Sequence, residues 1–240
     1  MTDSVSVSLI IPAFNEMECI ENTVRESYGV LKKMTKGFEL IVINDGSTDE
    51  TPAILDRLRC EMQELRVLDL IPQSGQSAGF GAGFANAKGD VIVLMDADGQ
   101  NDPADIPELV GKLDKCDICC GWRKNRQDKW SRTFGSKIAN IIRSMMLKDG
   151  IIDTGCSLKA FKSKFVRDLP MDLKGMHRFL PALAQMRGAR VDQVPVNHRE
   201  RQGGESKYTN FGRLMVAVSD LFSVRWMQKR HKNFEAKERE

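Results

Sequence analysis

The sequence is poor in the residues that several enzyme classes need. It has three histidines, none spaced as a metal-binding pair, and it contains no H-E-x-x-H motif. It has a single C-x-x-C, at Cys116–Cys119, whereas a four-cysteine zinc site needs two such pairs. These absences exclude a zinc peptidase and a four-cysteine zinc site. Cys116–Cys119 is instead interpreted as part of a short buried strand with reduced thiols.

Long apolar segments are also absent. No stretch approaches the roughly 18 consecutive apolar residues that a membrane-spanning helix needs. Residues 1–7 have neither the basic start nor the apolar centre of a signal peptide. We therefore expect a cytoplasmic location.

Charge is nearly balanced over the whole chain but unevenly distributed along it. The 240 residues carry a formal net charge of +3, which is too small to indicate a nucleic-acid partner. Residues 122–148, here called the basic segment, hold eight Lys or Arg residues and one acid, Asp128. This segment is either a solvated helix face or a surface that contacts phosphates and faces a membrane.

Apolar runs alternate with helical stretches, and this order predicts an α/β fold with a mostly parallel sheet flanked by helices. The expected strands are Val5–Ile11, Phe38–Ile43, Arg66–Leu70, Val91–Met95 and Asp117–Cys120, separated by helices at Glu16–Lys33, Asp49–Met62, Gln76–Ala87 and Asp105–Leu113. The second half adds helices at Arg132–Leu147 and Met176–Arg187, a short strand within Ile151–Lys162, a strand at Val191–His198 and a C-terminal helix at Tyr208–Met227. Sheets of this kind bind ligands at the carboxyl ends of their strands.

Asp96 and Asp98 follow one of these strands directly, with only Ala97 between them. Two carboxylates in such a loop can turn toward one hard cation, and Mg²⁺ is typically held by one or two carboxylates together with substrate phosphates. Gln100 follows them in the sequence. The alternative interpretation is a polar turn that caps the helix near Asp105.

Other strand ends carry polar or aromatic residues. Asp45 follows the second strand and can accept hydrogen bonds from a base or a ribose, and Phe14 after the first strand can pack on a base. The glycine-rich stretch 75–83 fails the G-x-G-x-x-G pattern, so close helix packing is the better interpretation. Residues 199–208 are either an ordinary surface connection or a loop that closes over phosphates.

Taken in order, these motifs resemble the family 2 glycosyltransferases of GT-A fold, close to the dolichyl-phosphate mannosyltransferases and the bacterial polyprenyl-phosphate glycosyltransferases. The motifs that carry the resemblance are Leu9–Glu16, Ile41–Ser47, Gly75–Ala78, Asp96–Pro103, Gly121–Arg123, Asp153–Cys156 and Gly204–Lys207. The resemblance implies a GT-A catalytic domain at 1–210, followed at 211–240 by an amphipathic helix and a basic tail.

The resemblance also implies roles for individual residues. The nucleoside pocket would be lined by Pro12, Phe14, Glu16 and Asp45, and Mg²⁺ or Mn²⁺ would be held by Asp96, Asp98 and Gln100. Donor and acceptor phosphates would meet Arg123 and Arg132, the acceptor would lie near Asp153, and the closing loop would contribute Ser206 and Lys207.

The implied reaction is inverting transfer of a sugar from GDP-mannose or a UDP-sugar to a polyprenyl phosphate, by an enzyme attached peripherally to the inner face of the membrane. Self-association is compatible with the sequence. A second hypothesis keeps the family but makes the acceptor a sugar or protein hydroxyl, with Asp153 as general base. A third is a nucleotide-binding module without catalysis.

Overall fold

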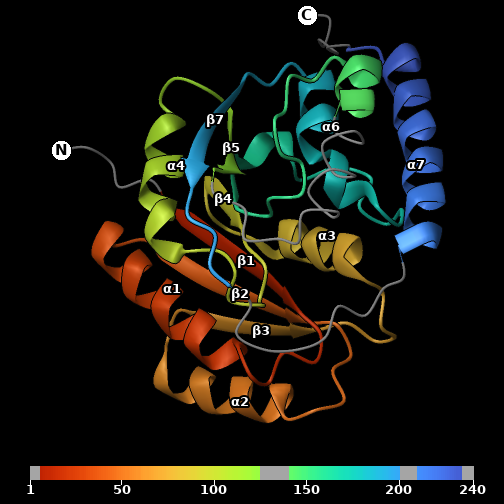
Figure 1. The fold of residues 1–240 in the computed structure, drawn as a ribbon. Coiled ribbons are helices and arrows are strands. Elements are labelled where there is room, and N and C mark those ends of the chain that lie inside the picture. Colours follow the sequence, from red (N-terminus) through yellow and green to blue (C-terminus); the bar gives the residue numbers. More distant parts are fainter. Residues whose placement is uncertain (1–5, 125–140, 201–209, 234–240) are drawn as a thin grey trace, which may run out of the picture.

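The computed structural model of the chain describes residues 6–124, 141–200 and 210–233, with side chains from 218 onward in the last stretch. Its centre is a seven-stranded sheet in the order β3-β2-β1-β4-β6-β5-β7 (Figure 1). The strands are β1 Val7–Ala13, β2 Phe38–Asn44, β3 Leu65–Asp69, β4 Val91–Leu94, β5 Ile118–Arg123, β6 Lys159–Lys162 and β7 Val191–Val196. The helices are α1 Ile20–Met34, α2 Thr51–Glu61, α3 Gln76–Asn86, α4 Ile106–Lys112, α6 Leu180–Met186 and α7 Asn210–Arg230, with 3-10 turns η1 Pro103–Asp105, η2 Ser163–Phe165 and η3 Met176–Phe179. Residues 141–147 are also helical.

The sheet is mostly parallel, as expected, with one strand reversed. Strand β6 pairs antiparallel with both β4 and β5, while β5 pairs parallel with β7. The carboxyl ends of the other strands therefore meet at one edge of the sheet, and β6 brings its amino end to that same edge. A residue that begins β6 thus lies beside residues that follow β4 and β5.

The first strand runs further than the sequence predicts. Proline has no N–H and normally ends a central strand, so Pro12 was expected to stop it. Instead β1 continues to Ala13, and Pro12 pairs in register with Ile43 of β2. On its other side β1 pairs with β4 only as far as Ile10, so Pro12 lies where β1 has a single neighbouring strand. The expectation was wrong because the missing donor faces no partner strand.

Apolar side chains cover both faces of the sheet, as the near-continuous apolar strands predict. One buried cluster joins β1, β2 and β4 to α1, α2 and α4, and a second joins the opposite face to α3, α6 and α7 (Figure 1). Cys119 and Cys120 belong to β5 and are fully buried, which confirms the strand interpretation of the C-x-x-C. Burial raises the pKa of both thiols to about 12.

Helix α3 approaches the sheet closely because it is rich in glycine. A Cβ built on Gly83 would lie 2.4 Å from Ile10 Cγ2, and one on Gly79 would lie 3.1 Å from Pro12 Cβ. These positions confirm the packing interpretation of the glycine-rich stretch. The close approach places the first turn of α3 at the carboxyl edge of the sheet.

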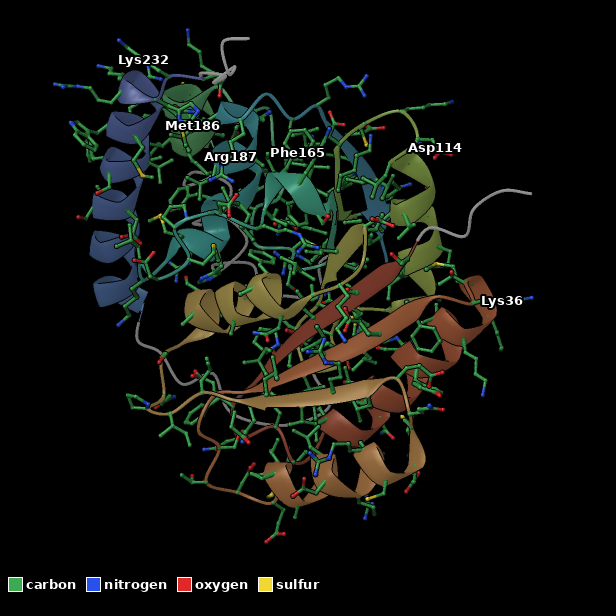
Figure 2. The ribbon with its side chains drawn as sticks, turned by 180° about the vertical axis from the view of Figure 1, so that it is seen from behind. Lys36, Asp114, Phe165, Met186, Arg187 and Lys232 are labelled. Atoms are coloured by element: carbon green, nitrogen blue, oxygen red, sulfur yellow. The ribbon has the colours of Figure 1, made fainter. Side chains whose placement is uncertain are left out.

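Helix α7 packs along one side of the molecule. It buries Leu221 and Val224, and Gln228 Nε2 donates to the carbonyl oxygen of Leu147 at 3.1 Å. Its far end lies next to α6, where Asn233 Nδ2 donates to the Met186 carbonyl at 3.2 Å (Figure 2). Within the described part of the chain, no helix is both long enough and apolar enough to cross a membrane.

Candidate active site

The acidic loop predicted from the sequence lies at the carboxyl end of β4. Asp96 Oδ1 accepts a hydrogen bond from Gln76 Nε2 at 2.6 Å, so α3 orients this carboxylate. Asp98 Oδ1 accepts from the Gln100 backbone N–H at 3.2 Å, which folds the loop back on itself. Gly99 makes this turn possible by adopting φ of +73°. The loop therefore brings Asp96, Asp98 and Gln100 to one part of the sheet edge.

The two carboxylates of the loop influence each other. Burial, followed by the charge of Asp98, raises the pKa of Asp96 to about 6, although Ser157 and the charges of Lys159 and Arg123 oppose the rise. Two anions held close together in a low-dielectric surrounding favour binding of a cation that neutralises both. Among the described residues, no three His, Cys, Asp or Glu side chains converge on one point. A cation here would therefore need the Gln100 amide and oxygens from a ligand as well.

The expected capping role belongs to a different acid of the same region. Asp102 accepts a hydrogen bond from the Ala104 N–H at 3.0 Å at the start of η1. Asp105 instead accepts from the Asn197 N–H at 2.8 Å. The helix start is thus capped without Asp96 or Asp98, which weakens the interpretation of these two acids as a mere capping turn.

A cavity of about 670 Å³ opens beside Asp96. One wall is formed by the 74–77 turn at the start of α3, and the floor by residues 154–159. Further lining comes from residues 174–180 and from Asp220 of α7. Three cationic side chains, Lys159, Lys174 and Arg178, line the cavity together with the acids Asp96 and Asp220.

Arg123 and Asp153, both predicted from the sequence, form one unit beside this cavity. Arg123 Nε lies 2.7 Å from Asp153 Oδ2 and Arg123 Nη2 lies 2.9 Å from Oδ1, a bidentate pair. The side chains are only 12% and 8% exposed. Asp153 also accepts from the Gly155 N–H at 3.1 Å, so the pair fixes the loop that forms the cavity floor.

Lys159, which the sequence did not single out, anchors the other end of that loop. It begins β6 and is 3% exposed. Its ammonium donates to the carbonyl oxygen of Cys156 and lies 3.5 Å from that of Thr154. Between these anchors, Ser157 Oγ donates to Asn101 Oδ1 at 2.7 Å, so the floor of the cavity is tied to the acidic loop.

Asp45 holds the 74–77 turn, which forms one wall of the cavity. Its two carboxylate oxygens accept hydrogen bonds from the N–H groups of Ser74 at 2.7 Å and Gly75 at 2.8 Å, and the residue is 4% exposed. Asp45 therefore positions backbone next to the cavity. Its contact with a nucleoside stays a prediction.

The other residues predicted for the nucleoside pocket lie close by on the β1 side of this edge. Pro12, Phe14 and Glu16 are half-buried at the end of β1 and in the turn that follows. The Glu16 N–H donates to Thr51 Oγ1 at 3.0 Å, which ties this turn to α2. The structure thus brings Pro12, Phe14 and Glu16 to the same edge as Asp45.

Part of the basic segment falls outside the described residues, and so does Arg132. The same holds for Ser206 and Lys207 of the predicted closing loop. Arg143 is described and lies on neither a solvated nor a phosphate-facing surface. It is 6% exposed and pairs with Asp149, so its role is structural.

His198, which sequence reasoning did not assign to the site, and Arg199, which begins the stretch 199–208 considered as a closing loop, lie beside the acidic loop. His198 Nε2 lies 3.5 Å from Gln100 Nε2, and the Arg199 N–H donates to the Gln100 carbonyl at 2.9 Å. Arg199 also pairs with Asp102 at 2.8 Å. Their position just after β7, at the same edge of the sheet as the acids, is the sequence feature that could have indicated them as site residues.

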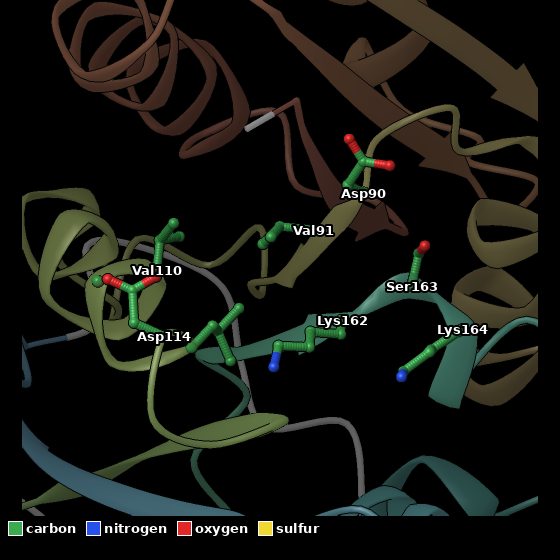
Figure 3. Close-up of a pocket in the computed structure, with 9 residues that line it drawn as sticks. Asp90, Val91, Val110, Asp114, Lys162, Ser163 and Lys164 are labelled. Carbon is green, nitrogen blue, oxygen red and sulfur yellow. The ribbon is translucent and has the colours of Figure 1, made fainter. Parts of the chain in front are cut away.

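A second cavity, of about 570 Å³, lies at the opposite edge of the sheet (Figure 3). It is lined by Asp90 before β4, by Val110 and Asp114, and by Lys162 and Lys164 at the end of β6. None of the predicted site residues lines it. Asp96, by contrast, lines the first cavity.

Comparison with known proteins agrees with this architecture. The family model described as Glycosyl transferase family 2 matches residues 8–169. Glucosyl-3-phosphoglycerate synthase from Mycobacterium tuberculosis, solved with Mn²⁺, UDP and glucosyl-3-phosphoglycerate, is 16% identical over 93% of this chain and 80% of that chain, with a TM-score of 0.67. Mannosyltransferase PcManGT from Pyrobaculum calidifontis, solved with GDP-Man and Mn²⁺, is 18% identical over 98% of this chain and 67% of that chain, with a TM-score of 0.68. At these identities the structures establish the fold, which is GT-A.

Proposed function

The chain belongs to glycosyl transferase family 2, and we propose that it transfers a sugar from a nucleotide-diphospho-sugar to a polyprenyl phosphate. The observation that carries the proposal is that Asp96, whose neighbour in charge is Asp98, lines a cavity together with Lys159, Lys174 and Arg178. A pyrophosphate needs a cation between itself and the two carboxylates, while a second phosphate fits the cationic walls. Solved structures of similar fold contain UDP-glucose or GDP-mannose, which supports a donor of this kind.

The residues present fit a divalent metal ion. Asp96 and Asp98 supply hard carboxylate oxygens, and Gln100 supplies an amide oxygen, as Mg²⁺ and Mn²⁺ prefer. Burial, and after it the charge of Asp98, raises the pKa of Asp96, and a bound cation would stabilise the ionised carboxylate against both effects. When bound, the ion would stabilise the negative charge of the departing nucleoside diphosphate.

The proposed reaction needs no strong base. An acceptor phosphate oxygen, already anionic at neutral pH, forms a bond to the anomeric carbon. The bond from that carbon to the diphosphate breaks, and its electron pair leaves with the nucleoside diphosphate. The protein's task is therefore to orient two phosphate groups in line, and we assign this task to the cavity walls next to Asp45 and Arg123.

The alternative hydroxyl acceptor is less well supported. It needs a general base, and Asp153 was the candidate from the sequence. Both carboxylate oxygens of Asp153 are engaged by Arg123, so proton abstraction there would have to break a nearly buried ion pair. A non-catalytic module is disfavoured by the intact acidic loop.

The proposed function is tested by assaying the purified chain with GDP-mannose and UDP-sugars, with Mn²⁺ or Mg²⁺. Thermal-shift measurements identify the donor first, since a ligand of the folded state raises Tm by mass action. Transfer to polyprenyl phosphate is then compared with transfer to soluble sugars. We expect lipid-linked product, and we expect Asp98→Ala to abolish it while the matched control Asp114→Asn, at the far cavity, retains it. Preference for a soluble hydroxyl acceptor would overturn the proposal.

We further propose that the exposed apolar surface of α7 rests on a membrane. Phe222 and Trp226 are each 61% exposed one turn apart, and Met145 on helix 141–147 is 68% exposed. Lys229, Arg230 and Lys232 follow on the same helix end and suit anionic headgroups.

The test is flotation with anionic vesicles. Phe222→Ser with Trp226→Ser should release the protein, whereas the control Ile71→Ser, at an apolar residue that is 90% exposed elsewhere, should not. Unchanged flotation of the double variant would refute this surface.

A further inference from the structure

One wall of the cavity, here called the basic wall, combines three basic side chains with one acid. Lys174, His177 and Arg178 come from the turn before η3 and from η3 itself, and Asp220 comes from α7. His177 is held in place by Ser77, whose Oγ lies 2.8 Å from His177 Nδ1 and 3.3 Å from its backbone nitrogen. The basic wall is thus fixed to the start of α3.

Asp220 is an unusual feature of this wall. Its Oδ2 is enclosed by protein yet has no hydrogen-bond partner among the residues described. Burial raises the pKa of Asp220, and the charges of Arg178 and Lys174 oppose that rise. An enclosed polar atom without a partner costs free energy, and such groups are uncommon in folded proteins. This cost calls for an explanation in terms of function.

The backbone of the basic wall comes very close to the acid. Gly175 has φ of +88°, and a Cβ built there would lie 2.4 Å from Asp220 Oδ2. Only glycine lets the 174–178 segment approach α7 so closely. Asp220 therefore lies against the segment that carries Lys174 and Arg178, and its charge partly neutralises theirs.

We propose that Lys174 and Arg178 form the subsite for the phosphate of the acceptor, and that the charge of Asp220 lowers the affinity of this subsite for anions. The inference rests on the proposed function and deepens it. A phosphate monoester has the charge and the acceptor oxygens that Lys and Arg recognise. The donor would occupy the other side of Asp96, near the turn held by Asp45.

The place of Asp220 on α7 also suits a lipid-linked phosphate. Val218 is 40% exposed and Phe222 is 61% exposed, and these two residues flank Asp220 in the sequence by two positions on either side. One side of α7 thus lines the cavity while neighbouring residues expose apolar surface. A prenyl chain attached to a phosphate at Lys174 and Arg178 would leave the cavity along this helix.

The inference is tested by steady-state kinetics with farnesyl phosphate as a short acceptor and with the donor identified by thermal shift. We expect Lys174→Met and Arg178→Met each to raise the KM for the acceptor about tenfold or more, with the KM for the donor changed less than about twofold. Asp220→Asn should lower the acceptor KM several-fold. The matched control Lys164→Met, in the far cavity, should change neither constant.

Several outcomes would overturn the inference. A rise in the donor KM alone would assign the basic wall to the donor diphosphate. Unchanged constants in folded Lys174→Met and Arg178→Met would show that no phosphate binds there. A collapse of kcat in Asp220→Asn would make Asp220 a general base. Lys174→Arg and Arg178→Lys, which keep the charge, should fold and retain most of the acceptor affinity; loss of that affinity in both would also refute the subsite. If the wild-type chain transfers no sugar to any prenyl phosphate, the proposed function itself fails, which is a distinguishable result.

Discussion

The Arg123–Asp153 pair offers a quantitative test of how the cavity floor is held. Two contacts of 2.7 and 2.9 Å join side chains that are 12% and 8% exposed. Removing one partner of a buried pair leaves the other charge uncompensated and costs about 3–5 kcal/mol. Because both groups keep slight exposure, we expect about 3 kcal/mol for Arg123→Gln and the same for Asp153→Asn. In a chain of this size each loss corresponds to a drop in Tm of about 6–12 °C.

The double variant is the informative measurement. With both charges gone, no unpaired charge remains, so the double variant should cost about as much as either single one, with a coupling of about 2–3 kcal/mol. Urea denaturation followed by tryptophan fluorescence gives the three free energies of unfolding. Additive losses, with coupling under about 0.5 kcal/mol, would refute the pair as the anchor of the floor.

Activity of the same variants separates the two roles considered for Asp153. If Asp153 only positions Arg123, both single variants should lose similar activity and the double variant should lose little more. If Asp153 were a general base, Asp153→Asn would lower kcat far more than Arg123→Gln. It would also remove the acidic limb of the pH–rate profile.

Two further predictions concern stability. Burial opposes ionisation of Asp117, but hydrogen bonds from the Arg190 backbone and side chain and from Lys162 lower its pKa well below the usual range. Its ionised form therefore stabilises the fold above the unfolded pKa of about 4, and this contribution is lost as the pH falls further. Asp117→Asn should cost about 2 kcal/mol at pH 7 in urea denaturation, with a gap to wild type that narrows toward pH 3; a constant gap would contradict the assignment. Gly83→Ala should cost about 1–3 kcal/mol, because its Cβ would overlap Ile10, whereas Gly29→Ala, whose Cβ meets nothing within 4 Å, should be neutral or stabilising in the same assay.

Local patterns predicted the part of the site that follows the ends of strands. Asp96 directly follows an apolar run, Asp45 follows another after Asn44, and Asp98 comes two residues after Asp96. A parallel sheet brings such positions to one edge whatever the rest of the chain does. The same reasoning predicted that Arg123, which follows the expected strand Asp117–Cys120 and ends β5, lies at this edge. These predictions needed only the strand boundaries, and the shift of β1 past Pro12 left Pro12 at the same edge.

The other walls of the cavity depended on information that local patterns lack. Strand β6 has four residues, and its apolar pattern is the same in either direction, so nothing in the sequence showed that it runs antiparallel. That reversal is what turns Lys159, at the start of a strand, toward the acids at the ends of others. His198 was missed for a related reason, since its partner Gln100 is 98 positions away along the chain.

The basic wall was the hardest part of the cavity to predict, because its residues come from elements that lie far apart in the sequence. Arg178 begins a helical stretch, and Asp220 lies within a helix whose apolar residues dominate its pattern. Their meeting involves Gly175, whose positive φ and missing side chain leave room for the Asp220 carboxylate. In the sequence Gly175 is one glycine among 19, and only the packing of α7 gives it a role.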